Sequence, residues 1–185
     1  MGIFAGDFRK EYRTALRFAD TIYGIETEKV DITVSLTPGV KGWGGGTYLS
    51  GAFLGSDIVG TNAIKKDGIV IQVVLAEEGY SGPGPHQVYT PTNMTLSSEE
   101  MTWKLTKGDC DLRDMSLRWQ VKKCLEETKV HLVSNIREQD ALGTRFAAVF
   151  RTINKALARA LEEKGRDVDI AVIDRAGRPN YMLPH

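Results

Sequence analysis

The chain has few of the residues that mark a secreted or metal-binding protein. Its 185 residues include only two cysteines, Cys110 and Cys124, and three histidines. There is no Cys-x-x-Cys pair, and no two histidines have the spacing of metal ligands, so we expect no metal site built by this chain alone. The N-terminal stretch is too short and too polar for a secretory signal peptide. These absences favour a reducing cytoplasm in which both thiols are free.

An excess of charge and long apolar runs are also missing. Lys and Arg number 24, as do Asp and Glu, which gives a formal net charge of zero. Nucleic-acid-binding domains usually carry a basic excess, so this balance argues against a nucleic-acid partner. No apolar run approaches the roughly 20 residues that cross a bilayer, which argues against a membrane partner. The length suits one domain, spanning residues 1–185, with a substantial core.

What the chain does have is an alternation of strand-like and helix-like segments from end to end. Apolar, β-branched runs typical of strands occur at 30–36, 70–75, 130–134 and 169–174. Helical spacing of apolar residues occurs at 8–25, 48–64, 112–128 and 153–164, and a further helix begins after Ser97. Strands that alternate with helices indicate an α/β protein. We expect a three-layer, Rossmann-like sandwich with a mainly parallel sheet.

Local signals predict where three of these helices begin or end. Asp7 is expected to cap the start of the first helix. Ser97 is expected to cap another, with Glu100 completing a capping box. Gly165 is expected to end the 153–164 helix.

A glycine-rich segment between the first strand and the second helix is the strongest site prediction. It reads Gly42-Trp43-Gly44-Gly45-Gly46-Thr47-Tyr48. Such a loop lies at the carboxyl ends of the strands, where α/β sheets bind ligands, and its N–H groups suit a phosphate or carboxylate. It is not a Walker loop, and Thr47 replaces the third glycine of a dinucleotide motif. The alternative is a flexible turn without a ligand, although Trp43 is better suited to a pocket wall than to the core.

A second long irregular stretch, 76–93, carries further candidates. Glu77 and Glu78 directly follow a buried strand, where catalytic carboxylates are often placed, or they form a solvated acidic pair. His86 lies in a Gly-Pro run and is either a proton carrier or incidental. His131 lies within a strand and is expected to be packed or exposed rather than functional. No G-x-S-x-G elbow is present, which excludes an α/β-hydrolase.

Short motifs follow one another in a characteristic order along nearly the whole chain. They are Gly6-Asp7, Asp31-Ile32-Thr33-Val34, Pro38-Gly39, Tyr48, Asp67-Gly68-Ile69-Val70-Ile71, Glu78-Gly79-Tyr80-Ser81-Gly82, Lys129-Val130-His131-Leu132-Val133-Ser134 and Asp169-Ile170-Ala171-Val172-Ile173. With the alanine-rich helix before the last of them, this order resembles the C-terminal domain of the lactate racemase family. Racemases of that family use a nickel-pincer nucleotide.

The resemblance implies roles for particular residues. The residues implied to face substrate or cofactor are Trp43, Gly44, Gly45, Gly46, Thr47, Tyr48, Glu78 and Gly79. Tyr48 and Trp119 join His86 as catalytic candidates. The family's helix begins Tyr-Gln-x-x-Lys, and here Leu49 and Ala52 replace the Gln and the Lys. These changes remove an amide and a cation that would hold the carboxylate of a 2-hydroxy acid.

The resemblance also implies a function. In the family, the lysine that tethers the cofactor and the metal-binding histidines lie in an N-terminal domain that these residues do not contain. We therefore expect this chain to close the substrate cleft of a 2-hydroxy acid racemase or epimerase. A partner N-terminal domain or subunit would hold the nickel-pincer nucleotide, and the chain by itself would be inactive. A homo-oligomer is also compatible with this view.

Two other functions stay open from the residues themselves. One is a non-catalytic, Rossmann-like module that binds an anionic ligand or another protein. The other is a free-standing α/β enzyme that uses Glu77, Glu78 and His86.

Overall fold

Five parallel strands form the centre of the fold. The computed structural model describes residues 2–36, 63–74, 96–110, 112, 115, 119, 122–123, 126–136, 146–173 and 181–184. Its elements are α1 (Phe8–Tyr23), β1 (Gly24–Thr27), β2 (Val30–Leu36), β3 (Ile64–Val73), α3 (Ser98–Lys107), β4 (Lys129–Val133), β5 (Ala148–Phe150), α6 (Ile153–Lys164), β6 (Ile170–Ile173) and β7 (Tyr181–Pro184).

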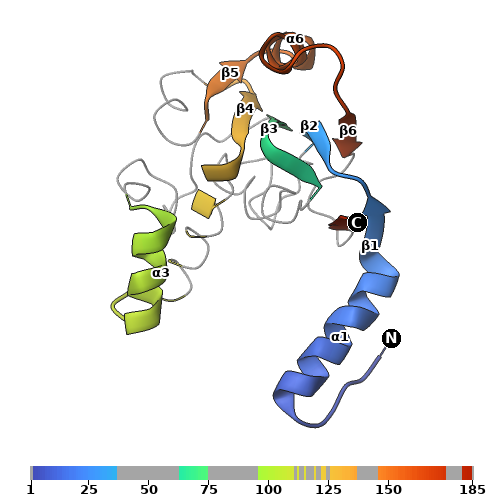
Figure 1. The fold of residues 1–185 in the computed structure, drawn as a ribbon, viewed down its shortest axis with the longest axis vertical. Helices are drawn as coiled ribbons and strands as arrows, with labels where there is room; N and C mark the ends of the chain where they lie inside the picture. Colours follow the sequence, from blue (N-terminus) through green and yellow to red (C-terminus); the bar gives the residue numbers. More distant parts are fainter. Residues whose placement is uncertain are drawn as a thin grey trace.

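The sheet confirms the predicted fold class. Its strands lie in the order β5-β4-β3-β2-β6, and each neighbouring pair is parallel. The chain moves from β2 through β3 and β4 to β5, then returns across the sheet to β6. Because such crossovers are right-handed, connections that run in opposite directions lie on opposite faces. Figure 1 shows α6, which contacts β3, β4 and β5, on one side of the strands and α3 toward the other, which is consistent with a three-layer sandwich.

The core lies between the sheet and α6. Ile32, Val34, Ile69, Ile71 and Val133 point to this face and are buried against Ala156 and Ala160 of α6. Both alanines are fully buried. Their small side chains, one helical turn apart, let the helix backbone lie close to the strands, which explains why α6 is rich in alanine on this side.

All three predicted helix signals are confirmed. The Asp7 carboxylate accepts a hydrogen bond from the backbone N–H of Lys10 at 3.1 Å. Ser97 and Glu100 form the complete capping box at the start of α3. Gly165 follows α6 with φ of +93°, a conformation that residues with a Cβ rarely adopt.

The boundaries of several elements differ from the sequence prediction. α1 stops at Tyr23, because Gly24 starts a strand that pairs in parallel with β7. β3 begins at Ile64, so it includes the polar residues before the apolar run. The described residues between 112 and 127 are helical, as predicted. Most of the helix predicted at 48–64 lies outside the described residues, and its last residue, Ile64, belongs to β3.

The amino ends of three adjacent strands are joined by one lysine. The Lys65 Nζ lies 2.8 Å from Asp31 Oδ2 and 3.1 Å from Asp169 Oδ2. The hydrogen bond from Lys65, with a second from the backbone N–H of Asp169, lowers the pKa of Asp31. These contacts are partly exposed, so they add little stability.

No described helix is both long enough and apolar enough to cross a membrane.

Candidate functional site

The carboxyl ends of the parallel strands are where this fold is expected to bind a ligand. β2 ends at Leu36, directly before the glycine-rich segment, and β3 ends at Val73, shortly before Glu77 and Glu78. The strand order reverses between β2 and β6, because β3 to β5 lie on one side of β2 and β6 on the other. Ligands of open α/β sheets bind at such a reversal. We call this side of the sheet the carboxyl edge.

A row of polar side chains is buried just below the carboxyl edge. Ser35 of β2 and Gln72 of β3 are register partners on neighbouring strands, and both are completely buried. Thr33 lies on the same face of β2, one pleat earlier, and is 1% exposed. Buried strands of a parallel sheet are normally apolar on both faces. Polar side chains that are buried this deeply are therefore unusual for such a sheet.

An arginine lies at the same carboxyl edge, next to β5, the outermost strand of the sheet. Arg151 follows the last residue of β5, and its Nη1 donates a hydrogen bond to the backbone oxygen of Ser134 at 3.1 Å. Ser134 follows β4, and its backbone N–H donates to the oxygen of Phe150. A guanidinium carries five N–H donors in a planar fork that matches a carboxylate, and this contact uses one of them. Arg151 is thus a described cation at the carboxyl edge.

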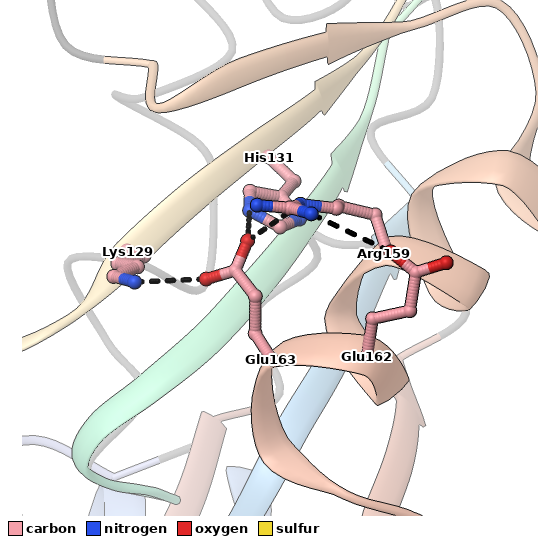
Figure 2. Close-up of polar contacts among 5 residues, drawn as sticks. All are labelled: Lys129, His131, Arg159, Glu162 and Glu163. Atoms are coloured by element: carbon pink, nitrogen blue, oxygen red, sulfur yellow. Dashed lines mark hydrogen bonds and ion pairs between the residues drawn. The ribbon is translucent and has the colours of Figure 1, made fainter.

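Titratable side chains also gather around α6, away from that edge. Figure 2 shows the Glu163 carboxylate between Lys129 and the His131 ring. Its oxygens lie 2.8 Å from Lys129 Nζ, 3.0 Å from Arg159 Nε and 3.6 Å from His131 Nε2. The hydrogen bond from Lys129, more than the other cations, lowers the pKa of Glu163.

His131 is a packed side chain, which is one of the two interpretations, packed or exposed, that the sequence left open. It lies in the middle of β4 under α6, is 1% exposed, and stacks at a tilt on Phe150 with 5.4 Å between ring centres. Burial lowers the pKa of His131 despite the nearby Glu163 carboxylate. The neutral ring faces the core rather than the carboxyl edge, so it is not placed to transfer protons to a ligand there.

Most of the predicted site residues fall outside the part of the chain that the structure describes. They are Trp43, Gly44, Gly45, Gly46, Thr47, Tyr48, Glu77, Glu78, Gly79 and His86. Trp119 is described: it is helical, half-buried, and lies between Leu112 and Glu127 in the sequence.

The sequence analysis missed Ser35, Gln72 and Arg151. The first two were visible as polar residues inside otherwise apolar strand segments. Arg151 had no such signal, since β5 is only three residues long and was not predicted.

The described residues contain no group of three or more His, Cys, Asp or Glu side chains that could hold a metal ion.

Comparison with known proteins gives a likeness in fold. No protein-family model matches the chain, and no curated protein matches it. The lactate racemase apoprotein from Thermoanaerobacterium thermosaccharolyticum matches 94% of this chain and 40% of its own, with a TM-score of 0.68 and 17% identity. A Thermotoga maritima protein solved by structural genomics matches 96% of this chain and 43% of its own, with a TM-score of 0.56 and 13% identity. The chain thus spans about two fifths of both, and is distantly related in fold to a part of lactate racemase.

Proposed function

We propose that residues 1–185 form the C-terminal domain or subunit of a lactate-racemase-like isomerase, a 2-hydroxy acid racemase or epimerase of the cytoplasm. The observation that carries this proposal is the match of almost the whole chain to part of lactate racemase. The motif order along the sequence supports it independently. The free thiol of Cys110 is compatible with a reducing compartment.

In this proposal the carboxyl edge forms one wall of the substrate cleft. Trp43, Gly44, Gly45, Gly46, Thr47, Tyr48, Glu78 and Gly79 would face the substrate or the cofactor. Leu49 and Ala52 stand where the family has its amide and cation, so another donor must hold the substrate carboxylate. Arg151 is the described residue with the chemistry for that task, because its guanidinium can donate two parallel hydrogen bonds to a carboxylate.

The partner supplies the rest of the site. Inverting a carbon centre by two bases requires a proton carrier on each face of that carbon. His131 is packed away from the edge, and of the catalytic candidates Tyr48, Trp119 and His86 only Tyr48 and His86 have a side chain that can carry a proton. The N-terminal domain or subunit would therefore hold the nickel-pincer nucleotide and the remaining proton carriers.

A second candidate function is a non-catalytic binding module for an anionic ligand or a protein. It is favoured by the loss of the family's Gln and Lys at Leu49 and Ala52, because a chain without catalysis no longer needs them.

The proposed function predicts that activity depends on a partner. The chain, affinity-tagged and isolated from its native cells together with bound proteins, is assayed on a panel of 2-hydroxy acid enantiomers by chiral chromatography. We expect the complex to interconvert at least one pair of enantiomers and the separated chain to convert none.

In the complex, Arg151→Met should raise KM by about tenfold or more, since a hydrogen bond to a charged group contributes about 1.5–3 kcal/mol.

Arg166→Met is the matched control, because Arg166 is exposed and lies away from the carboxyl edge. It follows the end of α6, where Glu163 pairs with Lys129 at the amino end of β4. It should leave KM unchanged. Equal activity of the separated chain and the complex would contradict the proposal, as would a complex that leaves every acid unchanged. The binding-module function predicts that last result.

A further inference from the structure

The apolar side of α1 is exposed. Phe8, Tyr12, Leu16 and Ile22 are 80, 57, 46 and 52% exposed. Together with Ala15 and Ala19 they recur at intervals of three and four residues and form a stripe covering about 120° of the helix surface. We call these six residues the α1 stripe. A stripe of this width on a helix of globular proteins is normally buried against another element.

Within the part of the chain that the structure describes, the four large side chains of the stripe stay exposed, while Ala15 and Ala19 are half-buried. Figure 1 shows α1 extending from β1 away from the five-stranded sheet. The residues before the helix pack on the flank beside the stripe, where the ring of Phe4 contacts Phe18 with 5.5 Å between centres. Phe8 and Tyr12 stack on each other along the stripe, with 6.1 Å between ring centres. The opposite side of the helix is basic and carries Arg13 and Arg17.

We propose that the α1 stripe is the contact surface of a homodimer, in which two copies of α1 pack antiparallel about a two-fold axis. With the axis passing between Ala15 and Leu16, each Tyr12 lies opposite Ala19 of the second copy. Each Leu16 lies opposite Ala15, and each Phe8 lies close to Ile22. At the centre of the contact each large side chain thus meets an alanine, which allows close helix packing, while Phe8 and Ile22 pack on each other at its ends.

Charges beside the stripe fit the same arrangement. Arg9 and Asp20 lie on one flank of the stripe, near opposite ends of α1. In an antiparallel pair that flank meets the same flank of the second copy. Arg9 of each copy therefore lies near Asp20 of the other, which forms two equivalent ion pairs. A parallel pair would not bring these unlike charges together, so the charge pattern favours the antiparallel dimer.

The dimer predicts a defined response to substitution. In sedimentation equilibrium across micromolar concentrations we expect the whole chain to be a dimer. Leu16→Asp should raise the dimer dissociation constant by at least about tenfold, because it buries an unpaired charge in the contact. Thr14→Asp, the same change on the opposite side of α1, should leave the constant unchanged. Far-ultraviolet circular dichroism checks that both variants keep their helices.

A charge exchange tests the orientation. Arg9→Asp and Asp20→Arg should each weaken the dimer, and the double variant should restore it, an outcome that a merely structural role of either residue would not give. A chain that stays monomeric at all these concentrations would overturn the proposal. Monomeric binding to anionic lipid vesicles through the stripe would overturn it too, as would a stripe covered only by the N-terminal partner. None of these results decides the proposed activity.

Discussion

Replacing Ile71 by alanine is expected to lower the free energy of unfolding by about 2–5 kcal/mol, the usual cost of removing a large side chain from a packed core. Ile71 is fully buried in the central strand β3. It lies between Val34 and His131 on the adjacent strands, under α6. Urea denaturation of the two proteins measures the difference, provided that the slope with denaturant concentration stays the same.

The matched control lies in the same row of side chains. Val172 of β6 pairs with Val34 on the other side and is 67% exposed. Val172→Ala should change the free energy of unfolding by about 0.5 kcal/mol or less, as surface substitutions do. Similar losses for both variants would show that α6 does not cover the sheet as described.

Acid should destabilise the native protein through His131, and His131→Leu should remove this effect. Burial lowers the pKa of His131 in the folded chain below its ordinary value of about 6.5. The unfolded chain then binds more protons as the pH falls below about 6.5, so the stability falls with the pH, by up to about 1.4 kcal/mol per pH unit. The loss ends once the pH passes the lower pKa of the folded state.

The charged groups around the ring make this a specific test. Glu163 favours the protonated ring, whereas Lys129 and Arg159 oppose it. Thermal or urea unfolding measured from pH 7.5 to pH 5 should give a steeper decline for the native chain than for His131→Leu. Parallel curves would mean that the ring titrates as it does in the unfolded chain.

The sequence predicted those parts of the fold that have strong local signals. β2 and α6 each have a long apolar pattern and a clear terminus, and both match the structure closely. β5 and the β1–β7 pair were missed, because strands of three or four residues show no periodicity. They form only because distant segments supply hydrogen-bond partners, as when Gly24 pairs with Tyr181.

The site was less predictable than the fold. The motifs pointed to loops at the carboxyl edge, but only the strand order shows where along that edge the direction of the connections reverses. Nothing local in the sequence says that Ser35 and Gln72 are register partners, or that Arg151 contacts Ser134. Such facts depend on how strands far apart in the chain align. The exposed stripe on α1 was equally hidden, since the same periodicity is typical of a helix buried on its own sheet.

The central claim is that ligands bind at the carboxyl edge of the sheet. It is tested most directly by nuclear magnetic resonance of the ¹⁵N-labelled chain during titration with D- and L-lactate, with propionate, which lacks the hydroxyl group, as the control. We predict that lactate shifts the backbone amides of Ser35, Val73 and Ser134 more than propionate does. The amides of Lys65 and Lys129, at the opposite end of the strands, should not move. Shifts confined to the amino ends, or no shifts at all, would contradict the account.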